Sequence, residues 1–214
     1  LSSGDSPGIF LIEIAHLDTL SRSRFIIAIM QLQLSRETAY SLVVEKIGVN
    51  NLLKHILAVE AGMRRLAQHF GEDIEFWGLT GLIHDLDYNE TKNDEQRHTH
   101  VTAEWLAPYH LPEEMQYAIH AHPGHVPCRS RLDWALYSID PTTGFIVACA
   151  LMHPEKKLSV VDADFMMRRF KEKRFAAGAT RENMAACVNL GLELEPFLLL
   201  VHDGMLQIAG ELGL

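Results

Sequence analysis

Apolar residues recur at spacings of three and four through most of the chain, and this helical period is the strongest constraint on its fold. The clearest case lies between Asn50, a residue typical of a helix start, and Gly71, a residue typical of a helix end. The apolar positions between them are Leu52, Ile56, Val59, Met63, Leu66 and Phe70. Because a helix turns by about 100° per residue, these side chains share one face, and we expect that face to be buried.

The same period predicts helices along the rest of the chain. Ser35 is a good N-cap for a helix that runs to about Ile47, and Gly48 ends it. The other predicted helices are 73–86, one that starts at Pro112, two pieces of 130–152 separated at Pro141, and 162–175, 180–190 and 193–211. Alternating strand patterns are absent, so the sequence predicts an all-α fold, a single-domain helical bundle.

Residues 1–29 lack the regular pattern of the rest and are read as an N-terminal extension, which leaves 30–214 as the helical domain. No basic segment followed by a long apolar one occurs in 1–29, so we expect no signal peptide there. No apolar run approaches the roughly 18 residues of a membrane span, and we expect no membrane partner.

Charge and cysteine content exclude several other classes of protein. The chain has 19 basic and 28 acidic residues, a net charge of −9, which argues against a nucleic-acid polymer as partner. Cys128, Cys149 and Cys187 lie far apart. A sparse, odd set of cysteines favours a reducing cytoplasmic location over a disulfide framework or a thiolate metal site.

Histidine is the residue type in clear excess. Of the twelve in the chain, seven lie between positions 84 and 125. Histidine is the commonest metal ligand and a general acid or base near neutral pH, so this stretch is where we expect chemistry.

Four polar residues interrupt the most apolar predicted helices: His55, the pair His84-Asp85, and Asp140. A buried carboxylate without a partner is costly, so such groups are usually paired or bound to metal. Two histidines and two aspartates from three helices can supply nitrogen and oxygen ligands for one divalent ion. Two structural readings compete with this one, a hydrogen-bonded core histidine for His55 and an N-cap of a helix starting at Pro141 for Asp140.

The order His55, His84-Asp85, Asp140 on helices resembles the HD superfamily of metal-dependent phosphohydrolases. The resemblance covers roughly residues 35–152, and the flanking sequences ILAVEAGMRRLA and IDPTTGFIVACAL are similar to small bacterial members. It implies an all-helical fold, a metal held by the four residues, and hydrolysis of phosphate esters. One subset reads His-Asp-Ile-Gly, whereas Leu86 and Asp87 follow here, so functions specific to that subset do not carry over.

Some members of this superfamily bind two metals through two further histidines, and the resemblance makes His98 and His122 the candidates. Residues two apart on a helix point in nearly opposite directions. Only one of His98 and His100, and one of His120 and His122, is therefore expected to face the site.

Phosphate chemistry also needs an acid for the leaving group and cations for the phosphate. Asp87 and Glu90, just past the His-Asp pair, are the candidate acids, and Lys92 and Arg97 in the following polar stretch are the candidate phosphate ligands. Asp87 can equally be the solvated end of its helix.

The function that this reading predicts is hydrolysis of a small phosphate ester, a monoester or diester such as a nucleotide, by water activated at a metal. One or two divalent ions per chain are expected, from among Mn, Ni, Co, Zn, Mg and Fe. The alternatives are a di-iron oxygenase of the same superfamily and a non-catalytic module that binds a nucleotide. The sequence leaves open the identities of the substrate and the metal, and the oligomeric state.

Overall fold

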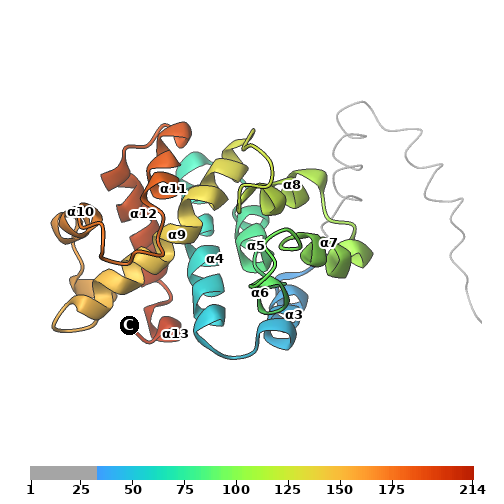
Figure 1. The fold of residues 1–214 in the computed structure, drawn as a ribbon, viewed down its shortest axis with the longest axis horizontal. Coiled ribbons are helices and arrows are strands. Elements are labelled where there is room, and N and C mark those ends of the chain that lie inside the picture. Colours follow the sequence, from blue (N-terminus) through green and yellow to red (C-terminus); the bar gives the residue numbers. More distant parts are fainter. Residues whose placement is uncertain (1–32) are drawn as a thin grey trace, which may run out of the picture. The chain divides into compact units, whose positions relative to one another are not determined.

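Helices are the only regular secondary structure in residues 33–214, the part of the chain that the computed structural model describes. The predicted all-α fold is thus confirmed for these residues, and Leu34–Leu214 form one compact unit (Figure 1). The extension predicted over 1–29 lies outside the described residues. The elements are α3 (Arg36–Ile47), α4 (Asn51–Phe70), α5 (Ile74–Ile83), α6 (Tyr88–Thr91), α7 (His100–Leu106), α8 (Glu113–Ala121), α9 (Arg131–Met152), α10 (Ala163–Phe170), α11 (Arg181–Ala185), α12 (Leu194–Leu206) and α13 (Ala209–Leu212), with short 3₁₀ helices at Ala107–Tyr109, Leu158–Val160 and Ala186–Leu190.

Capping side chains begin the first two helices where the sequence predicts. The Ser35 Oγ accepts the backbone N–H of Thr38 (3.2 Å), and Asn50 Oδ1 accepts that of Leu52 (2.8 Å). Gly71 ends α4 in the left-handed region, at φ 70°. Each of these boundaries depends only on residues close in sequence, which is why the sequence alone is sufficient to place them.

Helix α4 lies at the centre of the described unit, with α5 on one side and α9 and α12 on the other (Figure 1). Glycines allow two of these close approaches. A Cβ at Gly81 of α5 would lie 3.1 Å from the Glu60 Cα, and one at Gly204 of α12 would lie 2.6 Å from the Ala61 carbonyl oxygen. The end of α5, which carries His84, is thereby held directly beside α4.

Helix α9 continues without interruption past Pro141, so the predicted break there is wrong. Asp140 consequently lies inside a helix and is not its N-cap. Proline removes one backbone hydrogen bond, the one to the Tyr137 carbonyl. The hydroxyls of Thr142 and Thr143 add side-chain hydrogen bonds to the nearby carbonyls of Ser138 and Asp140 (2.7 and 3.0 Å). Because the flanking apolar residues are buried in the core, tertiary packing stabilises the continuous helix.

By length and composition α9 could also cross a membrane. However, 56% of its most apolar stretch is buried inside the protein. The core helix of a folded domain has this character.

The helix predicted over 73–86 ends at Ile83, and the His84-Asp85 pair follows in a turn. The Asp87 N–H donates to Thr102 Oγ1 (3.1 Å) instead of to the Ile83 carbonyl, which accepts from Leu86 (3.3 Å). A contact with a residue fifteen positions away therefore ends this helix.

The three predicted C-terminal helices are shorter or divided. The segment predicted as 162–175 forms only α10, which ends at Phe170, because Arg181 binds the carbonyls of Phe170 and Phe175 (3.1 and 2.6 Å). The segments 180–190 and 193–211 form α11 with a 3₁₀ helix and α12 with α13, respectively.

Candidate metal centre

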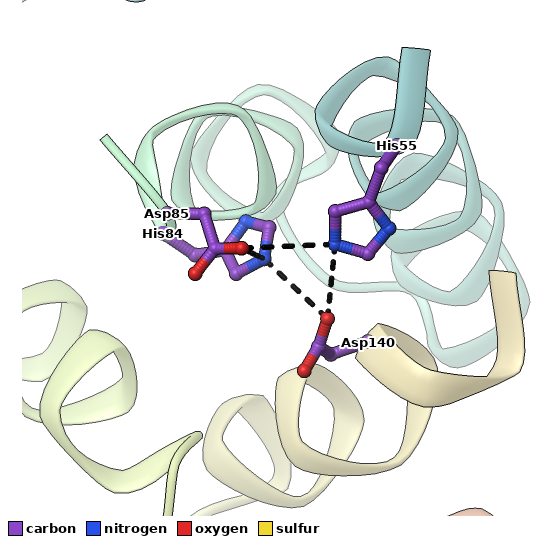
Figure 2. A group of neighbouring side chains, drawn as sticks. All are labelled: His55, His84, Asp85 and Asp140. Carbon is purple, nitrogen blue, oxygen red and sulfur yellow. Dashed lines mark ion pairs between the residues drawn. The ribbon is translucent and has the colours of Figure 1, made fainter. Parts of the chain in front are cut away.

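Three helices bring His55, His84, Asp85 and Asp140 to one point (Figure 2). His55 lies on α4, the His84-Asp85 pair follows α5, and Asp140 lies on α9. His55 Nε2 is 3.0 Å from Asp140 Oδ1 and 3.8 Å from Asp85 Oδ2, and His84 Nε2 is 3.7 and 3.6 Å from the same two atoms. The structure therefore brings together the four residues that the sequence proposes as metal ligands; they are called group 1 below.

Asp85 also faces a second set of ligands, formed with His98 and His122 and called group 2 below. The Nε2 atoms of His98 and His122 lie 3.3 and 3.4 Å from Asp85 Oδ1, and 3.3 Å from each other. Asp85 thus directs Oδ2 to group 1 and Oδ1 to group 2. One carboxylate joins the two groups.

In each of the four histidines of groups 1 and 2, the Nδ1 atom has a hydrogen-bond partner in the protein. The partners are Thr143 Oγ1 for His55 (3.1 Å), the Gly81 carbonyl for His84 (2.8 Å), Asp87 Oδ1 for His98 (2.8 Å) and the Ile119 carbonyl for His122 (2.6 Å). Imidazoles that bind metal usually donate their second N–H in this way, which orients the ring and keeps the Nε2 lone pair available. All four Nε2 atoms consequently face Asp85 or Asp140.

His84 provides a test of whether a metal fits. Its side chain is completely buried, yet its Nε2 has no hydrogen-bond partner among the described residues. Leaving such an atom unpaired costs about 1–3 kcal/mol, which a bound cation would remove. Two ligands about 2.1 Å from a tetrahedral ion lie about 3.4 Å apart, and the separations in group 1 run from 3.0 to 3.8 Å. The residues fit a divalent ion with nitrogen and oxygen ligands.

Mutual contacts set the charges of these groups. Burial raises the pKa of the Asp140 carboxyl, but its hydrogen bond with His55 and further contacts outweigh burial and hold the pKa well below its usual range. Burial likewise raises the pKa of Asp85, and the neighbouring His84 leads the contacts that bring it well below normal. Burial lowers the pKa of His98, but nearby carboxylates raise it to about 9. The carboxylates are therefore ionised at neutral pH, the form that binds metal.

Asp87 lies behind His98. Its side chain is fully buried, with Oδ1 accepting from His98 Nδ1 (2.8 Å) and Oδ2 from the Thr102 N–H (3.0 Å). Burial raises the pKa of this carboxyl, but the hydrogen bonds from His98 and Thr102 outweigh burial and lower it. This placement favours a positioning role for Asp87 over the predicted role as leaving-group acid. The sequence signal for this positioning role was only an acidic residue two positions after Asp85.

The structure does not gather the other predicted residues at the ligands. Glu90 and Arg97 pair with each other (Oε1 to Nη2, 2.8 Å) with about half of each side chain exposed, 46% and 53%. Lys92 lines a hollow of about 370 Å³ that it shares with Tyr88 and His98. Of these three residues, Lys92 is the one that shares a hollow with a ligand residue, His98, in the described part of the chain.

The two ligand groups open into a cleft of about 630 Å³, called the metal cleft below. Leu52, Tyr88 and Pro123 lie on its lining, and a segment far along the chain, 176–183, contributes five more residues. Within 33–214, no lysine or arginine lines it. Sequence reasoning missed this segment; the available signal was its run of small residues, Ala-Ala-Gly-Ala-Thr, directly after a highly charged stretch.

The histidine excess divides into two clusters. His98 and His122 face Asp85, whereas His100 and His120 contact each other edge to face, with ring centroids 4.7 Å apart. Thr99, at φ 68°, turns the chain between His98 and His100. One member of each closely spaced pair therefore lies at the ligand groups.

Two comparisons with known proteins agree with this geometry. The HD domain family model matches residues 52–143, the segment that contains both ligand groups. Ribonuclease Y of Desulfotalea psychrophila (strain LSv54 / DSM 12343) is 30% identical over 94 residues, which are 44% of this chain and 18% of that protein. The chain thus matches less than a fifth of the length of this relative. No solved structure is significantly similar to the chain. Residues 52–143 are therefore similar to the HD domain family.

Proposed function

We propose that this protein is a metal-dependent hydrolase of a small phosphate ester. The observation that carries the proposal is the pair of ligand groups that share Asp85 at one end of the metal cleft. His55, His84, Asp85 and Asp140 would hold one divalent ion, and Asp85, His98 and His122 a second. The chemistry that such ions supply is activation of water as a nucleophile and neutralisation of charge on the phosphoryl oxygens.

The side chains themselves have defined tasks in this proposal. The contacts at Nδ1 keep each imidazole oriented with its Nε2 toward the ligand groups, so little reorganisation is needed when substrate enters. Apolar residues in the lining of the metal cleft, such as Leu52 and Ala148, lower the polarity beside the ligand groups, which would strengthen electrostatic interactions at the phosphate. Lys92, in the adjoining hollow, remains our candidate for an outer phosphate contact, and Glu90 and Arg97 remain weaker candidates because they pair with each other.

A small ester fits this site better than a polymer. The name of ribonuclease Y implies that this relative cuts RNA. RNA binding relies on lysine and arginine contacts to phosphates along the backbone. The present chain has a net charge of −9, and the described lining of its metal cleft has no such cation. The cytoplasmic location also stays part of the proposal, supported by three free cysteines.

The test is metal analysis of the purified protein, followed by phosphate release from a panel of monoesters and diesters with the identified metal added. We expect turnover of at least one ester that His84→Ala abolishes. His69→Ala is the matched control, because His69 lies on α4 with His55 but is exposed and outside both groups. A di-iron centre that consumes oxygen would instead favour the oxygenase. Tight nucleotide binding without turnover at any metal would favour the regulatory module.

A further inference from the structure

One wall of the metal cleft, formed by residues 176–183, comes from outside the segment that matches the HD domain family. Ala176, Gly178, Ala179, Thr180 and Asn183 line the cleft together with the ligands, whereas the family match ends at residue 143. A wall built from a segment that the family match does not cover is a place where specificity particular to this chain can be encoded.

Arg181 holds this wall in shape. Its guanidinium donates to the carbonyls of Phe170, Phe175, Ala176 and Ala179 at 3.1, 2.6, 3.3 and 2.6 Å. A planar guanidinium with fixed donors imposes a defined geometry on the backbone that it binds. Ala176 adopts a left-handed conformation at φ 44°, which the surrounding contacts must support. The wall is therefore preorganised before any ligand binds.

Thr180 and Asn183 are the polar side chains of this wall, and a hydrogen bond fixes the orientation of Asn183. The Tyr137 hydroxyl donates to Asn183 Oδ1 (3.0 Å). An amide whose oxygen is already engaged offers its Nδ2 as a donor, and within the described residues that nitrogen has no acceptor. A ligand in the metal cleft would satisfy it with a carbonyl, nitro or ring-nitrogen acceptor.

Charge excludes a second anionic group from the wall end of the cleft. Metal ions at the ligand groups would neutralise the negative charge of the phosphate, but no lysine or arginine of the described chain lines the rest of the cleft. Desolvating an anion without a cation or several donors is unfavourable.

Resting on the proposed function, we propose that the wall 176–183 selects phosphate monoesters whose organic group is uncharged and carries a hydrogen-bond acceptor. Esters with a second anionic group, polyphosphates included, are rejected. Gly178 lines this wall, and a side chain can be added there without displacing protein atoms, because a Cβ at this position would meet none within 4 Å.

Binding measurements on the Mn²⁺-loaded protein test this inference independently of turnover. The probes are inorganic phosphate, which occupies only the ligand end, and two stable phosphonates of nearly equal shape, 4-nitrobenzylphosphonate and 4-carboxybenzylphosphonate. We expect the uncharged nitro compound to bind at least about tenfold more tightly than the carboxylate, by calorimetry.

Two variants test whether residues of the wall produce this difference in affinity. Gly178→Leu should weaken binding of the nitro compound by more than about tenfold and leave that of inorganic phosphate unchanged, because its side chain fills only the wall end. Asn183→Leu should weaken it about tenfold, the effect of one lost hydrogen bond. Gly210→Leu is the control, since its Cβ also meets no protein atom within 4 Å but lies on α13, outside the metal cleft.

Equal affinities for the two phosphonates, or an unchanged affinity in Gly178→Leu, would overturn the inference. The proposed hydrolysis and the proposed selectivity are rejected by different outcomes. Selective binding of the nitro compound without phosphate release from any ester of the panel would reject hydrolysis and keep the wall. Hydrolysis without this selectivity would reject only the wall.

Discussion

The His98 Nδ1 atom lies 2.8 Å from Asp87 Oδ1, and the Asp87 side chain is completely buried behind the imidazole. The carboxylate thus fixes which His98 nitrogen carries the hydrogen and directs Nε2 to Asp85, 3.3 Å away. Such carboxylate–imidazole pairs orient metal ligands in many proteins.

Replacing Asp87 should weaken metal binding at group 2. Asp87→Asn removes the negative charge that orients His98, and we expect the affinity for the second ion to fall about 10- to 100-fold, with that of the first ion little changed. Competition with a chromophoric chelator measures both affinities. Asp94→Asn is the control, because Asp94 is exposed in the same stretch of chain. Two unaltered affinities would show that Asp87 has no such role.

Metal stoichiometry should separate the two ligand groups. Because Asp85 belongs to both groups, Asp85→Ala should lose both ions, whereas His122→Ala should lose only one. The ratio of metal to protein after dialysis, by mass spectrometry of the elements, gives the answer. Two bound ions in Asp85→Ala would contradict the proposed metal site. A single bound ion in the wild type would show that only one of the two groups binds metal.

The approach of α5 to α4 should be sensitive to Gly81. A Cβ there meets the Glu60 backbone at 3.1 to 3.2 Å, so Gly81→Ala forces the helices apart and should cost about 1–3 kcal/mol in urea unfolding. Gly144→Ala is the contrasting variant, because its Cβ meets no protein atom within 4 Å and α9 gains a better helix former. It should stabilise the protein by about 0.5–1 kcal/mol. Equal effects of the two substitutions would argue against tight packing at Gly81.

Stability should decline at alkaline pH through the thiols. Burial raises the pKa of Cys149 to about 12 and those of Cys128 and Cys187 to about 11, from the ordinary thiol value of 9.0. Since the folded pKa values exceed the unfolded ones, the contribution is fully present below about pH 9 and is lost as the pH rises toward 11 or 12. Urea unfolding from pH 8 to 10.5 should show the decline, and a triple Cys→Ala variant should show a smaller one. An identical slope in the two proteins would exclude the thiols as its source.

The local sequence determined the starts and ends of the first helices. Ser35, Asn50 and Gly71 bind or shape backbone groups within a few residues of themselves. The helix ends that they set can therefore be predicted without a structure. The sequence also indicated which residues are candidates for a functional site, because the polar side chains of His55, Asp85 and Asp140 interrupt apolar helical faces. The resemblance carried by their order selected the ligands, and the HD domain match over 52–143 agrees with it.

Only the tertiary structure decided how distant segments complete the site. Pro141 does not end α9, because packing in the core stabilises the continuous helix. Asp87 lies beside His98 because its N–H binds Thr102, fifteen residues away, instead of continuing α5. Glu90 and Arg97 lie near the ligands in sequence but pair at the surface. Asn183 lies more than forty residues beyond the last ligand and still lines the cleft. Hydrogen bonds along a helix are local, whereas the lining of a cleft depends on which faces pack together, and that packing is a property of the whole chain.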